Sequence, residues 1–138
     1  EHSFSGWLKT HAAKGFGKNI DIVGLALYPE DNPVGMSLER AFDSAAEALP
    51  GQKLMLSSFG YAEQDEVKGY WWLAPDDVDG ARKDIAILYT TASCAMTHSL
   101  GGGFWWQTLE QMLPPGHHKA ADLFKVYRRT LEQLGRKE

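Results

Sequence analysis

Cysteine is nearly absent from this chain of 138 residues, which has only Cys94. One thiol can form no internal disulfide, and it cannot supply a zinc site or redox motif that needs two cysteines. An excess of positive charge is also lacking, because 14 Lys and Arg residues stand against 18 Asp and Glu residues, for a net charge of -4. A broad field that attracts polyanions is therefore excluded, and we expect no nucleic-acid partner.

Long apolar segments are lacking too. No apolar run reaches the roughly 18 residues of a membrane span, and the N-terminus shows neither the basic nor the apolar region of a signal peptide. We expect a soluble chain with no membrane partner. Its localisation stays open, and since the first residue is Glu1, secretion or periplasmic export followed by processing fits the sequence. With 43% hydrophobic residues, the chain has the composition of a globular domain.

The order of the predicted elements indicates an α/β fold. Apolar runs of strand length alternate with segments of helical periodicity, which predicts a parallel sheet covered by helices. The strands are expected at 20–28, 53–61 and 103–109, and the helices at 5–14, 38–49, 80–100 and 118–134. Three strands alone leave unpaired edges, whereas consecutive strand–helix units fit a (β/α)8 (TIM) barrel, which normally takes about 250 residues. We therefore expect residues 1–138 to form a single, incomplete part of such a barrel.

Aromatic rings and hydrogen-bonding groups gather where the predicted strands end, and ligand sites of parallel sheets lie at this edge. The residues concerned at the three strand ends are Tyr28, Ser58, Tyr61, Trp105, Trp106, Gln107 and Glu110. Trp71 and Trp72 follow in the loop after the second strand. Such a mixture suits a neutral, polyhydroxylated ligand, because a ring packs on the apolar face of a sugar while polar groups bind its hydroxyls.

A second interpretation is that these rings only fill the core, as aromatic side chains often do. It is weaker for the pairs Trp71–Trp72 and Trp105–Trp106, since neighbours in an extended chain point to opposite faces. Glu110 is either a ligand for sugar hydroxyls or a surface carboxylate. Asp76, Asp77 and Asp79 are spaced like the start of a calcium loop, but the downstream glycine and glutamate are missing. We expect neither a metal nor a cofactor.

Three segments resemble the large clan of retaining (β/α)8-barrel glycoside hydrolases. Residues 53–61, KLMLSSFGY, are similar to the clan's seventh-strand motif K-P-(apolar)-(apolar)-(S/T)-E-(F/Y)-G. Residues 21–29, DIVGLALYP, resemble the sixth-strand pattern D-x-x-G-x-x-x-Y-P. Residues 102–107, GGFWWQ, are similar to the eighth strand, which ends in a tryptophan that lines the sugar subsite. The resemblance implies that the chain is the C-terminal part of the barrel, strands six to eight.

The resemblance also implies an activity, which is retaining hydrolysis of a β-linked oligosaccharide or polysaccharide. Tyr28 and Trp105 would line the subsite around the scissile bond, Gln107 and Glu110 would bind hydroxyls, and Trp71 or Trp72 would wall the cleft. The catalytic nucleophile, a glutamate in the clan, falls on Ser58. A serine has no carboxylate with which to form the glycosyl-enzyme intermediate, so Ser58 should not hydrolyse glycosides by that route.

Several alternatives remain open at this position. The glutamate was either deliberately replaced, which inactivates the enzyme or converts it to a synthase, or the chain is a naturally inactive relative. A shifted register would give the role to Glu63 instead. The clan's acid/base glutamate lies in an Asn-Glu pair that this sequence lacks, and the first five barrel strands are not in it. Either another chain or segment supplies these strands, or the chain is not a working barrel. A non-catalytic carbohydrate-binding α/β module is the alternative function, and a structural α/β domain is the third.

Overall fold

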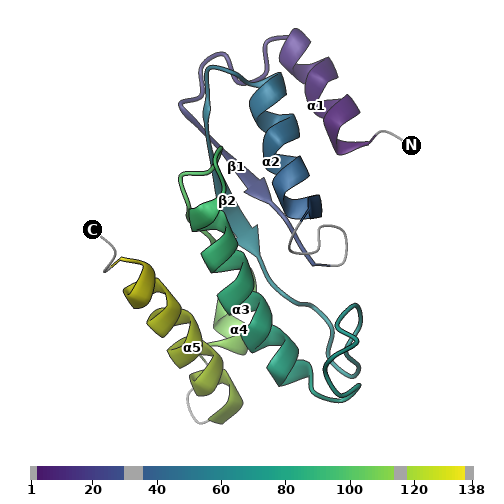
Figure 1. Cartoon of the computed structure of the whole chain (residues 1–138), viewed down its shortest axis with the longest axis vertical. Helices are drawn as coiled ribbons and strands as arrows, with labels where there is room; N and C mark the ends of the chain where they lie inside the picture. The colour runs from purple at the N-terminus through teal and green to yellow at the C-terminus, as the bar shows by residue number, and fades with distance from the viewer. Residues whose placement is uncertain (1–2, 30–35, 114–117, 136–138) are drawn as a thin grey trace.

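The computed structural model describes residues 3–29, 36–113 and 118–135 and contains a three-stranded parallel sheet. Figure 1 shows helices flanking its strands β1 and β2. The expected α/β class is confirmed. The elements are α1 (Phe4–Ala13), β1 (Ile22–Ala26), α2 (Met36–Ala48), β2 (Lys53–Phe59), α3 (Val78–Ala95), β3 (Phe104–Trp105), α4 (Thr108–Gln111) and α5 (His118–Leu134). Among these residues no helix combines the length and the apolar character that crossing a bilayer requires.

The strands lie in sequence order, β1-β2-β3, and both pairs are parallel. Crossovers between parallel strands are right-handed, so two successive crossovers in one direction bring α2 and α3 to the same face of the sheet. Figure 1 shows α1 beside α2 and α5 beside α3. The helices therefore cover one face of the sheet, and that face carries the core.

The alternation of side chains along the strands agrees with one covered face. On β2, Leu54 and Leu56 are buried, and Phe59 continues the same face with no exposed surface. Its ring stacks on Tyr89 of α3 at 5.6 Å between centroids. On β1 every second residue is exposed, and Ile22 keeps 46% of its surface open. The opposite face of β1 is thus bare and partly apolar, and β1 and β3 are the edges of the described sheet.

The third strand is much shorter than expected. The strand predicted over 103–109 is limited to Phe104–Trp105, and a helical turn, α4, begins at Thr108. Gln107 turns the chain with φ -97° and ψ 46°, and its carbonyl then accepts a hydrogen bond from Gln111 N at 2.9 Å. The helix predicted over 80–100 also ends early, at Ala95, because Met96 adopts an extended backbone.

Three consecutive glycines bring the chain alongside β2 before β3 begins. Gly101, Gly102 and Gly103 have φ values of 86°, 87° and 129°, a region that side chains disfavour. The Gly101 carbonyl accepts a hydrogen bond from Leu56 N at 3.1 Å. A Cβ on Gly102 would lie 3.0 Å from the carbonyl oxygen of Leu56. The glycine run therefore leads the chain onto β2 through a close backbone approach that needs positive φ.

Gly102→Ala is expected to lower the free energy of unfolding by about 2–3 kcal/mol, because a left-handed backbone and crowding against Leu56 O both penalise the new methyl group. The matched control is Gly69→Ala, since Gly69 has φ 82° but nothing within 4 Å of its Cβ position. This control should lose only about 1 kcal/mol. Urea denaturation of both variants measures the difference, and equal losses would contradict the close approach to β2.

Candidate functional site

The two hydroxyl groups of Ser58 and Tyr28 meet at the carboxyl end of the sheet. The register between β1 and β2 shifts after Leu25, so Ala26 pairs with Ser58 and Ser57 is the extra residue of a bulge. A bulge redirects side chains and is common beside functional sites. Tyr28 Oη and Ser58 Oγ lie 3.4 Å apart, and both groups are partly buried. Each hydroxyl can donate or accept a hydrogen bond, so the pair can bind a neutral polar ligand.

The bulge depends on a glycine in the neighbouring strand. A Cβ on Gly24 would lie 2.6 Å from Cβ of Ser57, a distance that real Cβ atoms do not reach. Gly24 therefore leaves the space into which the extra residue of β2 fits. In this way the sequence of β1 determines the local shape of β2 next to Ser58.

Tyr61 anchors the loop that follows β2. Its side chain is 1% exposed, and its hydroxyl accepts a hydrogen bond from Lys68 N at 2.7 Å and donates one to Lys68 O at 3.0 Å. Its ring packs edge-on against Tyr70, with 5.9 Å between centroids. Tyr61 was expected to bind substrate, and in this chain its hydroxyl is occupied by the loop backbone. The structure thus gives Tyr61 a definite role in holding residues 61–70 in place.

Trp71 and Trp72 lie on the same loop and are open to solvent. Trp71 is 89% exposed and Trp72 is 52% exposed, and their rings meet edge-to-face at 5.7 Å. Trp72 Nε1 donates a hydrogen bond to Asp84 of α3 at 3.3 Å, which fixes its ring against the helix. Trp71 therefore presents a ring that can pack on a ligand, supported by a fixed neighbour.

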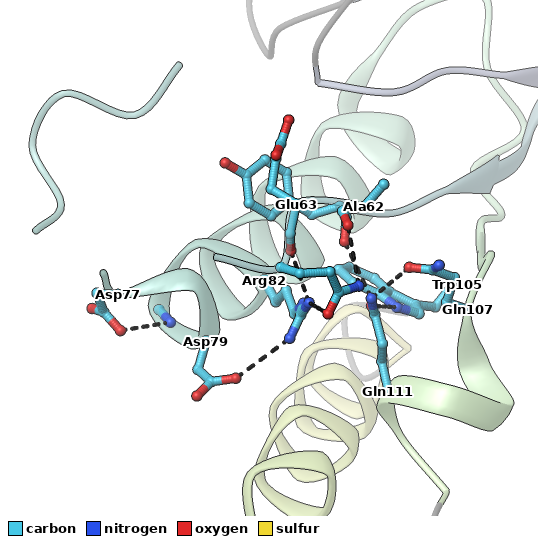
Figure 2. Close-up of polar contacts among 11 residues, drawn as sticks. Ala62, Glu63, Asp77, Asp79, Arg82, Trp105, Gln107 and Gln111 are labelled. Atoms are coloured by element: carbon cyan, nitrogen blue, oxygen red, sulfur yellow. Dashed lines mark hydrogen bonds and ion pairs between the residues drawn. The ribbon is translucent and has the colours of Figure 1, made fainter. Parts of the chain in front are cut away.

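Arg82 of α3 ties the other side of this loop to the helix (Figure 2). Its Nη2 donates to the carbonyl oxygen of Glu63 at 2.9 Å and to Gln64 Oε1 at 3.2 Å, and Nη1 lies 3.6 Å from Asp79. Burial lowers the pKa of Arg82, and the charge of Asp79 acts in the opposite direction. These contacts hold the backbone of the loop at its first turn.

Glu63, the alternative nucleophile, has an ion-pair partner. Its carboxylate accepts hydrogen bonds from Lys68 Nζ at 3.1 and 3.0 Å, and this hydrogen bond together with the charge of Glu63 raises the pKa of Lys68. Within residues 3–29, 36–113 and 118–135 no cluster of three potential metal ligands is found.

The two tryptophans at the end of β3 differ sharply in exposure. Trp105 is 2% exposed and packs edge-on against Phe59 at 5.5 Å, while Trp106 is 69% exposed. Trp106 N donates to Phe59 O at 2.8 Å, so this exposed ring is carried by a backbone tied to β2. Glu110 of α4 is also exposed. Of the two tryptophans, Trp106 is therefore the one whose ring a ligand can reach in the chain as described.

Gln111 has a central place that the sequence did not reveal. It is 9% exposed; it accepts a hydrogen bond from Trp105 Nε1 at 2.8 Å and donates one to Tyr61 O at 3.3 Å. Its amide also donates to Oε1 of Gln107 (Figure 2). The one signal in the sequence is that Gln107 and Gln111 are four residues apart. This spacing brings two side chains together only if the segment is helical, and the helical turn α4 was not predicted.

The predicted residues fall into two groups in the structure. Tyr28 and Ser58 lie at the carboxyl end of the sheet. There Ser58 pairs with Phe104, the residue just before Trp105 and Trp106. Trp71 and Trp72 belong to the loop, and among the described residues no hydrogen bond or ring contact joins them to Ser58. Comparison of the chain with protein-family models, with curated proteins and with solved structures finds no match.

Proposed function

We propose that this chain supplies strands six to eight of a retaining (β/α)8 glycoside hydrolase, with Ser58 at the position of the nucleophile. The observation that carries the proposal is the Tyr28–Ser58 hydroxyl pair at the bulged carboxyl end of β2. In a parallel sheet this edge is where ligands bind, and the pair lies beside the strand that leads to the exposed Trp106.

The form of the sheet supports the barrel part of the proposal. Barrel strands follow one another in sequence order with all helices outside, and the described sheet has this order and one covered face. The bare face carries Ile22, and Phe104 at the β3 edge is 68% exposed. Barrel closure would bury both side chains and pair both edge strands. In this proposal the chain has a protein partner, namely the remaining barrel strands, which another chain or segment supplies.

The chemistry of the site fits binding of a β-linked oligosaccharide or polysaccharide better than its hydrolysis. The hydroxyls of Tyr28 and Ser58 can bind sugar hydroxyls, and the ring of Trp106 can pack on a sugar face. Retaining hydrolysis needs a carboxylate where Ser58 stands. The enzyme is therefore inactivated at this step, or it acts as a synthase that accepts an activated donor and cannot hydrolyse the product.

The second candidate is a non-catalytic carbohydrate-binding module. The observation that favours it is that Trp106 is exposed and that the Tyr28–Ser58 hydroxyl pair contains no carboxylate. Such a module needs stacking rings and hydrogen bonds but no nucleophile. Both candidates predict binding of a neutral sugar at the carboxyl edge.

Sugar binding can be measured by calorimetric titration with β-linked gluco- and manno-oligosaccharides. We expect Trp106→Ala to weaken the binding of at least one of them about tenfold, because one stacked ring contributes about 1.4 kcal/mol. The control is Trp7→Ala, since Trp7 is also exposed, at 43%, but stacks on His11 within α1. It should bind like the wild type. Failure of every sugar to bind would contradict both candidates and favour a structural domain.

A further inference from the structure

A chain of side-chain hydrogen bonds connects the ends of β2 and β3 through Gln111 (Figure 2). The direction of each hydrogen bond follows from the chemistry of the partners. The indole N–H of Trp105 can only donate, so the atom of Gln111 that faces it must be the oxygen. The carbonyl of Tyr61 can only accept, so the atom of Gln111 that faces it must be the nitrogen. The two contacts agree, and the amide of Gln111 has one possible orientation.

The orientation of Gln111 determines that of Gln107. The nitrogen of Gln111 donates one hydrogen to Tyr61 O and the other to Gln107, so Gln107 must meet it with its oxygen. The nitrogen of Gln107 then points the other way, as Figure 2 shows. Among the described residues this nitrogen has no hydrogen-bond partner, although it carries two hydrogens. The hydrogen bonds of Gln111 thus leave the side-chain NH2 group of Gln107 free as a donor just beyond β3.

We propose that Gln111 is a positioning residue that fixes the orientation of the side-chain amide of Gln107, its polarity for short. In this orientation the NH2 group of Gln107 donates to an acceptor oxygen of the bound ligand. The ligand class, an oligosaccharide, rests on the proposed function, and its hydroxyl, ring and glycosidic oxygens can all accept. Gln111 is too deeply buried to reach the ligand, and it acts only through Gln107.

Side-chain hydrogen exchange, followed by NMR on the full 15N-labelled chain, tests the polarity directly. In the wild type the amide hydrogens of Gln111 should exchange about tenfold more slowly than those of Gln107, because only the former are hydrogen-bonded. In Q111E the new carboxylate has no hydrogen to donate, so Gln107 should turn and donate to it, which slows its exchange about tenfold. The Trp105 indole hydrogen should stay protected in both proteins.

Equal exchange of the two glutamine amides in the wild type would overturn the proposal, and this comparison needs no variant to fold. Unchanged exchange of Gln107 in a folded Q111E would overturn it as well. A rise in Gln107 protection is a result that mere loss of packing at Gln111 does not produce.

A sugar titration observed by the same NMR signals tests the link to the ligand. Binding of a gluco- or manno-oligosaccharide should shift the amide resonances of Gln107 and leave those of Gln111 in place, and Q111E should lose this response. Binding seen at the Trp106 indole with no shift at Gln107 would overturn the proposal. If no sugar binds, the proposed function fails together with the ligand part, while the exchange rates still decide whether Gln111 sets the polarity of Gln107.

Discussion

Ser58→Glu is expected to create β-glycosidase activity when the chain is assembled with the strands that complete the barrel. The carboxylate would stand at the bulged end of β2 beside the Tyr28 hydroxyl, where a retaining enzyme carries its nucleophile. Loss of a catalytic nucleophile costs about 10⁶-fold in a well-studied protease, so a gain of the same order is expected here. Release of an aryl leaving group from β-linked aryl glycosides measures it.

The matched control is Ser57→Glu, because Ser57 is the adjacent, extra residue of the same bulge, whereas Ser58 is the residue whose hydroxyl meets that of Tyr28. It should give no activity above the wild type. Activity in Ser57→Glu alone would show that the nucleophile position has been assigned one residue too late. Absence of activity in a folded, sugar-binding Ser58→Glu assembly would remove the assignment of Ser58.

Phe59→Ala is expected to lower the free energy of unfolding of the chain by about 3–5 kcal/mol. Phe59 has no exposed surface, and its ring contacts those of Tyr89, Trp105 and Tyr127. Its removal leaves a cavity between β2, α3 and α5 that these rigid rings cannot fill. Urea denaturation of the isolated chain measures the loss, and a loss below about 1 kcal/mol would contradict the packing of this core.

Phe104→Ala provides the control, and it also tests the bare sheet. Phe104 is 68% exposed, so its removal from the isolated chain should cost less than about 0.5 kcal/mol. In the completed barrel the same substitution should cost more, because partner strands would cover the ring. An equal, small cost in both states would contradict burial of this edge.

The sequence pattern was sufficient where local hydrophobicity determines the structure. The apolar runs of 20–28 and 53–61 contain β1 and β2, and the helix expected over 118–134 coincides with α5 (His118–Leu134). The third strand was overestimated because its aromatic residues favour a strand. The strand ends early because Gln107 turns the chain into the helical turn α4, which the hydrophobic pattern does not reveal.

The candidate site shows the same division. Motif positions indicated Ser58 and Tyr28, and the structure brings their hydroxyls within 3.4 Å. The roles of Tyr61 and Gln111 were not visible in the sequence, because the first depends on the path of a loop and the second on a short helix that replaces part of a strand. That these residues bind a sugar remains a prediction.

The native mass of the folded species in solution tests most directly the central claim that this sheet is one part of a barrel. The account predicts a folded species heavier than the 15.4 kDa chain, in which further strands pair with the edges β1 and β3. A folded species that stays at the mass of one 15.4 kDa chain at every protein concentration, with both edges unpaired, would contradict it.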